Sequence, residues 1–379
     1  MNTQNQSLRI LSIVPYKVFP ALMGGQKGIA LFYKYFAQLV SFACITVKKN
    51  EANEAYTVLN QISNSKTRYL NFFLFFKIKK IAKENDCTHL LFEHPYYAWM
   101  IVLFKFFSSE SVIVHSHNIE SERFKSIGKW WWKILWYYER IAYRFADYVW
   151  FKTDEDRKFA QLYFNLNETK CTTIPYGVEP IMLPTAEEIA VARKQIATLY
   201  TIADDETIIL FNGTLNYKPN LDALNAILNN INPLLLKQTL KYKILICGKN
   251  LPKEMNELEE FTALNIIYCG FVDDIDLYFK ACDIFLNPLQ DGGGIKTKLV
   301  EALGFGKKCV SSVNGAIGVN EICTEGRLQI VADKDWAAYA QAIIDINLKE
   351  IRNENQAFYQ VFSWQYIATK AVQSIQKVV

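Results

Sequence analysis

Several features typical of secreted and membrane proteins are missing from this chain of 379 residues. Its eight cysteines stand singly, with no Cys-x-x-Cys pair and no metal-like spacing to the four histidines. This distribution argues against a disulfide framework or a zinc site and predicts reduced, mostly buried thiols. No uncharged apolar run reaches the roughly 18 residues of a membrane-spanning helix. Residues 1–7 carry no basic segment, so we expect a cytoplasmic protein without a signal peptide.

The composition is that of a globular protein, because 51% of the residues are hydrophobic and 21% are charged. The length suggests two domains. The charge is uneven: residues 1–180 contain 23 Lys and Arg against 15 Asp and Glu, and the remainder contains 19 against 23. A basic first half favours an anionic partner there, such as a membrane surface, a phosphorylated acceptor or nucleic acid.

Strand-like and helix-like segments alternate along the whole chain. Residues 9–15 predict a strand. This strand is followed by a glycine loop at 24–28, a helix over 29–40 and a second strand at 42–47. The same rhythm starts again with a strand at 207–211. This alternation predicts an α/β protein with parallel sheets. The first glycine loop lacks the Gly-x-Gly-x-x-Gly pattern, so the signal for a dinucleotide site is weak.

The strongest functional signal is the segment 291–303, which reads DGGGIKTKLVEAL. It lies between a predicted strand at 283–288 and a predicted helix, so its glycines form a strand-to-helix turn. Backbone without side chains can approach a ligand closely, and a helix N-terminus attracts phosphate. Lys296 and Lys298 add positive charge, and Glu301 shares a helix face with Lys298. The segment predicts a phosphate site; the alternative is a loop with a solvated basic rim.

Polar residues follow two further predicted strands. The strand at 89–93 ends at Glu93 and His94, and the strand at 111–114 is followed by His117, Asn118 and Glu120. Groups at the carboxyl ends of parallel strands usually face the ligand. These residues are therefore candidates for a site, although a histidine is often only a structural residue with satisfied hydrogen bonds.

The segment 125–144 combines basic and aromatic residues and predicts one long helix. At about 100° per residue, one side is basic and carries Lys125, Lys129, Lys133, Arg140 and Arg144, with Trp132, Trp136 and Tyr143 beside them. The opposite side is apolar and is expected to face the core; its members are Trp131, Ile134, Tyr138, Ile141 and Phe145. The basic side has the composition of a surface that lies on anionic lipid. The alternative is a solvated helix face.

The pair Asp274 and Asp276 has the spacing that can hold a divalent metal against a diphosphate. It also begins a predicted helix, where an aspartate caps unpaired N–H groups. We favour capping.

Read in order, these motifs resemble glycosyltransferase family four over nearly the whole chain. The segment 292–303, preceded by Phe285-x-Asn287-Pro288, is similar to the donor site of that family. Further similarities are Gly24-Gly25, His117-Asn118-x-Glu120, residues 174–178, the stretch from Phe211-x-Gly213 to Lys218-Pro219-Asn220, and residues 362–364.

The resemblance implies the GT-B fold, in which two Rossmann-like domains face each other across a cleft. Residues 1–180 would form the acceptor-binding domain, to which a terminal helix at 362–379 returns, and residues 181–361 would bind the nucleotide sugar. It also implies a retaining transfer from a UDP- or GDP-type sugar to a glycan or lipid-linked acceptor. No cofactor and no essential metal are expected.

Residue roles follow from the same resemblance. His117 would touch the transferred sugar and Lys298 would place a charge on the diphosphate, and these two are the expected catalytic residues. Glu301 would bind ribose. Backbone N–H groups of Gly293, Gly294 and Ile295 would hold the diphosphate. The remaining expected substrate-binding residues are Gly25, Asn118, Glu120, Gly213, Lys218 and Lys296.

Two positions depart from the family pattern. Many members carry a glutamate where this chain has Gly293, so backbone contacts must replace its recognition of the sugar. Many members also carry an arginine after the glycine at Gly213 and a lysine six residues after that glycine; here those positions are Thr214 and Pro219. Lys218 lies one residue early, and Lys296 is expected to compensate for the arginine.

The leading hypothesis is a cytoplasmic glycosyltransferase, peripheral to the inner face of a membrane through helix 125–144, that extends a cell-envelope polysaccharide or glycolipid. A second is a nucleotide-sugar epimerase of related fold, with Glu93, His94 and His117 as candidate groups. A third is a non-catalytic subunit that binds nucleotide sugar. Nucleic-acid binding is not expected, because no known module is recognisable.

Overall fold

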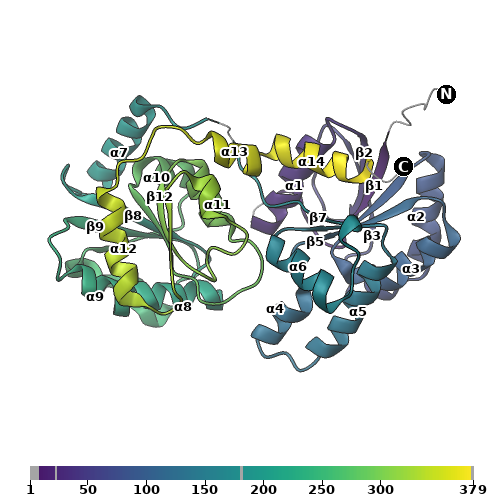
Figure 1. The fold of residues 1–379 in the computed structure, drawn as a ribbon, viewed down its shortest axis with the longest axis horizontal. Coiled ribbons are helices and arrows are strands. Elements are labelled where there is room, and N and C mark those ends of the chain that lie inside the picture. The colour runs from purple at the N-terminus through teal and green to yellow at the C-terminus, as the bar shows by residue number, and fades with distance from the viewer. Residues whose placement is uncertain (1–7, 22–23, 180–181, 377–379) are drawn as a thin grey trace. The chain divides into compact units, whose positions relative to one another are not determined.

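A computed structural model describes residues 8–21, 24–179 and 182–376, and the chain divides into two compact units. The first unit comprises Met1–Gly177 together with Trp364–Val379, and the second comprises Val178–Ser363. In Figure 1 the colour runs from purple through the first unit, then through the second unit, and the yellow C-terminal helix belongs to the first unit again. Each is an α/β unit built on its own parallel sheet, as the alternating pattern of the sequence predicted.

The sheet of the first unit has seven strands in the order β3-β2-β1-β4-β5-β6-β7, and every pair is parallel. Its central strands are almost fully buried, because helices cover both faces of such a sheet. The strands are β1 (Arg9–Ile13), β2 (Ser41–Val47), β3 (Thr57–Ile62), β4 (His89–Glu93), β5 (Ser111–Ser116), β6 (Tyr148–Phe151) and β7 (Cys171–Thr173).

The C-terminal helix α14 (Trp364–Gln376) packs beside α1 (Gly24–Phe36) in the first unit (Figure 1). Trp150 Nε1 in β6 donates to Ser374 Oγ of α14 at 2.9 Å. The predicted return of the terminal helix is therefore confirmed. The predicted single helix over 362–379 is interrupted, since Ser363 is extended between α13 (Gln356–Phe362) and α14; residues 377–379 lie outside the described ranges.

The prediction of one helix over 125–144 is wrong. The structure has α4 (Glu120–Ser126) and α5 (Trp132–Phe145) with a break between them. Gly128 takes a φ of 72°, in the left-handed region that an α-helix cannot accommodate. The remaining helices of the first unit are α2 (Phe73–Glu84), α3 (Ala98–Phe107) and α6 (Asp154–Tyr163).

The second unit has a six-stranded parallel sheet in the order β10-β9-β8-β11-β12-β13. Its strands are β8 (Thr207–Asn212), β9 (Tyr242–Cys247), β10 (Ile266–Gly270), β11 (Ile284–Asn287), β12 (Lys308–Ser312) and β13 (Leu328–Val331). Besides α13, its helices are α7 (Ala186–Tyr200), α8 (Lys218–Ala226), α9 (Asn232–Leu235), α10 (Ile275–Ala281), α11 (Thr297–Gly304) and α12 (Trp336–Leu348).

Three further expectations can be compared with the structure. All eight cysteines are free thiols, as predicted. The Asp274 carboxylate accepts hydrogen bonds from the backbone N–H groups of Asp276 and Leu277, so its predicted capping role is confirmed. The first helix begins at Gly24 rather than Ile29.

No helix within the described ranges is both long and apolar enough to cross a membrane.

The strand order of each sheet identifies where a ligand site is expected. In the first unit β1 lies between β2 and β4, and in the second β8 lies between β9 and β11. The chain direction across the sheet reverses at β1 and at β8, and ligands of such sheets bind beyond the carboxyl ends of the strands at this switch point. The segments that leave β4 and β11 at this edge begin at His94 and Pro288, and the sequence singled out both.

Candidate active site

The glycine segment of the second unit forms a closed loop between β11 and α11. Gly292 has a φ of 101° and Gly294 a φ of 70°, conformations that favour glycine. The ammonium group of Lys296 donates to the carbonyl oxygens of Gly292 and Gly294, at 2.7 and 2.9 Å. Lys296, predicted to bind the substrate in place of the missing arginine, thus holds the loop closed. Gly293, at the exposed tip, has no side chain to obstruct a ligand.

A lysine in the first turn of α11 and a glutamate in the second share one face of the helix, as the spacing predicted. Lys298 Nζ lies 2.7 Å from Glu301 Oε2, and the two side chains are 33% and 18% exposed. No side chain caps the N-terminus of α11, and its first turn contains no acidic residue. The partial positive charge of the helix end is therefore not neutralised locally, which suits an anionic group.

The loop between β8 and α8 lies beside the glycine loop. A Cβ placed on Gly292 would be 3.6 Å from Cγ of Pro219. A Cβ on Gly213 would lie only 2.7 Å from Nδ2 of Asn220, so close packing alone accounts for this glycine. Lys218 forms an ion pair with Asp222 on the same helix and is 72% exposed. The structure brings Lys218 to the surface here, and its role toward a substrate stays a prediction.

A residue from α12 that sequence reasoning missed supports the end of β11. The hydroxyl of Tyr339 accepts a hydrogen bond from the N–H of Asn287 at 3.0 Å. Asn287 Nδ2 in turn donates to Ser311 Oγ and to the carbonyl of Gly315, at 2.9 and 2.8 Å. These bonds fix the strand end from which the glycine loop departs. Tyr339 has no local sequence signal, because it is 52 positions from its partner.

In the first unit, Glu93 is the centre of a buried hydrogen-bond network. Its side chain is fully buried. One carboxylate oxygen accepts from the hydroxyl of Tyr33 at 2.8 Å and lies 3.2 Å from His115 Nδ1. The other lies 2.5 Å from Nε2 of His117. The carboxylate of Glu93 therefore fixes the imidazole of the predicted site residue His117. The sequence analysis named Glu93 only as a candidate group of the alternative epimerase hypothesis.

The protonation state of this network follows from burial. Burial lowers the pKa of His117 well below its ordinary value and lowers the pKa of His115 to about 4, so both imidazoles are neutral at pH 7. Burial also raises the pKa of Glu93, but its interactions with the two histidines outweigh this and keep it well below the usual range. Glu93 is thus the ionised acceptor and His117 donates its Nε2–H. The other ring nitrogen, Nδ1, is left as a hydrogen-bond acceptor.

His94 is held in a strained backbone conformation beside His117. Its φ of 65° and ψ of 161° lie in a region that is essentially reserved for glycine, at a cost of about 1–3 kcal/mol. The imidazole stacks on His117 with ring centroids 4.3 Å apart, and its Nε2 lies 2.9 Å from the hydroxyl of Tyr16. Strain of this kind is common at functional sites. It supports His94 as a candidate residue, as the sequence suggested.

Glu120 lies behind His94. Its side chain is 1% exposed, and Oε1 is 3.4 Å from His94 Nδ1. Burial raises the pKa of Glu120, but the nearby His94 and the charge of Arg123 lower it to about 2. Asn118 Nδ2 donates to the same oxygen at 3.5 Å. The structure therefore places Glu120 as a buried support for His94, and direct contact with a substrate stays a prediction.

Two further predictions concern Gly25 and metal binding. Gly25 lies in the first turn of α1, and a Cβ there would meet no atom of the described residues within 4 Å. Glu93, His115 and His117 offer ligand atoms within 4.8 Å of one another, a set that could hold a divalent ion. In the described part of the chain these same atoms already satisfy one another by hydrogen bonds.

Lys152 is a buried cation that sequence reasoning missed. It follows β6, next to the end of β5, and its ammonium group lies 5.7 Å from the ring centre of Phe32. The group makes no hydrogen bond to any residue in the described ranges. Burial lowers its pKa to about 8, against the opposing charge of Glu93. An unpartnered ammonium in the interior costs stability.

Comparisons with known proteins agree with this architecture. Residues 24–180 match Glycosyltransferase Family 4, and residues 206–347 match Glycosyl transferases group 1. A Klebsiella pneumoniae protein described as an uncharacterized 44.6 kDa protein in cps region is 22% identical over 315 residues, which cover 79% of this chain and 76% of that protein.

Two solved structures share the fold. The Anabaena protein HepE, solved in complex with UDP, has a TM-score of 0.72 at 15% identity and covers 98% of this chain and 100% of its own. WaaG, a glycosyltransferase involved in lipopolysaccharide biosynthesis, has a TM-score of 0.67 at 12% identity, with coverage of 98% and 100%. Together with the two parallel sheets and the glycine loop, these matches define a glycosyltransferase of the GT-B fold. The chain belongs to glycosyltransferase family four.

Replacing Lys152 by methionine is expected to stabilise the protein at pH 7. With a pKa of about 8 in the folded state against 10.5 unfolded, the lysine costs stability fully below pH 8, and the cost fades as pH rises toward 10.5. We expect a gain of about 1–3 kcal/mol at pH 7 that shrinks by pH 10, measured by urea unfolding at both pH values.

The exposed Lys158 on the next helix provides the matched control, and Lys158→Met is expected to change stability little. A loss of stability at pH 7 would show that the ammonium has a stabilising partner. A gain that did not depend on pH would show that the packing of methionine, and not the removal of a buried charge, is responsible.

Proposed function

We propose that this enzyme transfers a sugar from a nucleoside diphosphate sugar, of the UDP type, to a membrane-associated glycan or glycolipid of the cell envelope. Retention of the anomeric configuration and independence from a metal ion are parts of the proposal. The glycine loop with Lys298 and Glu301 at the N-terminus of α11 is the observation that carries it. The UDP found in the HepE structure supports the choice of nucleotide.

The chemistry assigned to the loop follows from charge development. As the glycosidic bond breaks, negative charge grows on the leaving diphosphate. Backbone N–H groups at Gly293, Gly294 and Ile295, the end of α11 and the ammonium of Lys298 would stabilise that charge. Fixed donors of this kind lower the barrier because they stabilise the transition state more than the bound substrate. They supply the positive charge that a metal ion provides in other sites.

His117 has the protonation state for a defined contact. With its Nε2–H donated to Glu93, its Nδ1 can accept a hydrogen bond but cannot donate one. The side chain is 11% exposed, so a ligand can reach it. We assign to Nδ1 a hydrogen bond from a hydroxyl of the transferred sugar. Glu93 keeps the imidazole in the tautomer that this contact requires.

A basic and apolar surface on the first unit supports a membrane-associated acceptor. The face of α5 predicted to be core exposes Ile134 and Ile141, at 65% and 44%, so that part of the prediction is wrong. Tyr143, expected beside the basic residues, is fully buried instead and anchors the helix. Exposed apolar residues therefore share one face with Lys133 and Arg144, and Trp130 in the preceding break is 81% exposed.

Exposed apolar and basic side chains on the same face are typical of a helix that lies in a lipid headgroup region. Below, the name α4–α5 face means the exposed residues Lys129, Trp130, Lys133, Ile134, Tyr137, Ile141 and Arg144. The described role of WaaG in lipopolysaccharide biosynthesis supports an acceptor of the cell envelope.

The substitution Lys298→Ala is expected to weaken UDP binding by about 1.5–3 kcal/mol, the range for a hydrogen bond to a charged group. Isothermal calorimetry measures the affinity. Lys253→Ala, which removes an exposed lysine from another part of the second unit, is the control and should leave it unchanged. Equal UDP affinity in the parent and Lys298→Ala proteins would remove the diphosphate role of Lys298.

Sugar transfer predicts that free UDP accumulates from a UDP-sugar only when an acceptor is added. Incubation with candidate UDP-sugars, with and without a bacterial membrane lipid extract, tests this by the UDP released. Proton NMR of the product reports the anomeric configuration, which should match that of the donor. Conversion of the donor to an isomer without release of UDP would instead identify an epimerase.

The α4–α5 face is expected to bind anionic vesicles. Replacing Lys129, Lys133 and Arg144 with glutamine should weaken co-sedimentation with phosphatidylglycerol vesicles by about 1 kcal/mol per residue. The same change at Lys194, Lys237 and Lys253, exposed lysines of the second unit, removes an equal charge and is the control. If both triple variants sediment alike, the contact is not through this face.

A further inference from the structure

A polar cavity lies in the second unit, at the edge of the sheet opposite the glycine loop. It encloses about 560 Å³ and is lined by Thr207 and Lys308, the first residues of β8 and β12. Asp283 and Arg327, which immediately precede β11 and β13, also line it. Because all strands of this sheet are parallel, these amino ends are at the far edge from the carboxyl end of β11. The cavity is therefore separate from the candidate active site.

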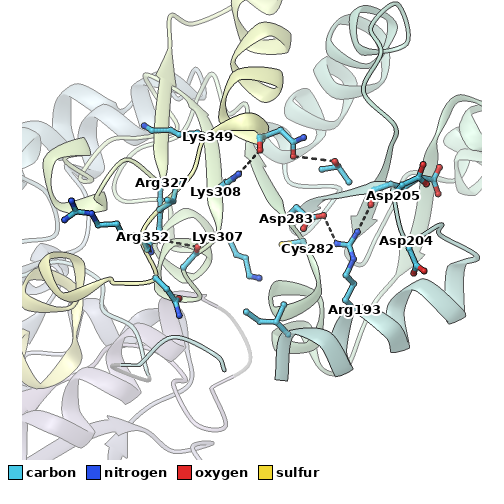
Figure 2. Close-up of a pocket in the computed structure, with 17 residues that line it drawn as sticks. Arg193, Asp204, Asp205, Cys282, Asp283, Lys307, Lys308, Arg327, Lys349 and Arg352 are labelled. Carbon is cyan, nitrogen blue, oxygen red and sulfur yellow. Dashed lines mark hydrogen bonds and ion pairs between the residues drawn. The ribbon is translucent and has the colours of Figure 1, made fainter. Parts of the chain in front are cut away.

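One side of this cavity is strongly basic. Figure 2 shows Lys307, Lys308, Arg327, Lys349 and Arg352 gathered on one side. Arg193 and Asp283 are on the other side, where Arg193 Nη1 lies 2.7 Å from Asp283 Oδ2. Asp204 and Asp205 are farther out on that side (Figure 2).

The basic side chains are held in place by backbone carbonyl groups at helix ends. Lys307 donates to the carbonyl of Lys280 near the end of α10, and Lys308 to that of Asn347 in the last turn of α12, each at 2.8 Å. Lys349 donates to the carbonyl of Gly326 at 3.1 Å. The carboxyl end of a helix attracts cations, which explains why they collect here. These carbonyl groups do not occupy all the hydrogen-bond donors of the lysines, because each ammonium has three N–H groups and donates one of them to a carbonyl.

Carboxylates do not balance these charges. With residues in the described ranges, Lys307, Lys308 and Lys349 form no ion pair within 4.0 Å. Six basic residues line the cavity against four acidic ones, Asp204, Asp205, Glu206 and Asp283. Of these four, Asp205 pairs with Lys241 at 2.6 Å, Glu206 with Lys243 at 3.7 Å and Asp283 with Arg193. The cavity therefore carries a net positive charge.

Two of the cations are almost completely buried. Lys307 is 7% exposed and Arg327 is 2% exposed. Burial lowers the pKa of Lys307 and of Lys308, and the charge of Asp283 opposes this shift only in part. Buried charges are normally paired. Arg327 has a carboxylate partner, since its Nη1 lies 3.3 Å from Glu325 Oε2. Lys307 has no carboxylate within 4.0 Å among the described residues, and an anion in the cavity would supply its missing partner.

We propose that this cavity binds a small phosphate-bearing anion. Ammonium and guanidinium groups that converge from one side are the usual ligands of phosphate oxygens. The volume is in the range of small-molecule sites and exceeds what a single phosphate group fills. The shared chemistry is the phosphate group, either free or as part of a phosphorylated metabolite.

The test is calorimetric titration of the protein with inorganic phosphate at low ionic strength. To separate this site from the glycine loop, the titration is run on the parent, on Lys298→Ala and on the double variant Lys308→Gln/Lys349→Gln. Glutamine keeps an N–H donor for the carbonyls of Asn347 and Gly326 while it removes the charge. Thermal melting checks that the variants are folded.

Saturable binding should persist in Lys298→Ala and weaken about tenfold or more in the double variant, since a charged hydrogen bond is lost at each position. Lys237→Gln/Lys253→Gln, with the same loss of charge elsewhere on the second unit, should bind as the parent does. Absence of saturable binding, equal affinity in the folded double variant, or loss of binding in Lys298→Ala alone would overturn the proposal. A hexose phosphate titrated in parallel distinguishes the sources: tighter binding identifies the ester, and equal binding the free anion.

Discussion

Parallel pairing of the strands is the constraint on which both functional regions depend. A parallel sheet places the carboxyl ends of all its strands at one edge and the amino ends at the other. In the second unit, the carboxyl end of β11 releases the glycine loop and the amino end of β12 carries Lys308. Helix N-termini gather at the first edge and helix C-termini at the second. One edge therefore offers N–H groups to an anion, and the other gathers lysines and arginines around carbonyl groups.

The two units prepare their polar groups in different ways. In the second unit, the candidate donor site is made of backbone and of the partly exposed pair Lys298 and Glu301, with Lys296 closing the loop. In the first unit, Glu93 is fully buried and ionised, and neutral imidazoles surround it. The first arrangement presents positive charge to a diphosphate. The second fixes the tautomer and orientation of His117, and the strain at His94 is part of what that rigid arrangement costs.

Sequence reasoning succeeded where the signal is local. A strand, three glycines and a helix with lysine and glutamate three residues apart are contiguous, so the glycine loop and the pair of Lys298 and Glu301 were predictable. The capping role of Asp274 was predictable for the same reason. The break in the expected helix 125–144 was not predictable, because the helical periodicity of basic and apolar residues continues across Gly128. The exposure of Ile134 was not predicted either, because the apolar side of the expected single helix was assigned to the core.

The order of residues along the chain by itself determined the α/β class, the two units and the loop that is proposed to hold a diphosphate, because periodicity and turn chemistry act over a few neighbours. Only the tertiary structure decided how His117 is protonated, that Lys296 closes its own loop, and that Lys307 and Lys308 line a charged cavity with Arg327. These properties depend on burial and on partners far apart in sequence, such as Tyr33 and Glu93. Hydrogen bonding and desolvation act through space, and no local pattern of residues encodes them.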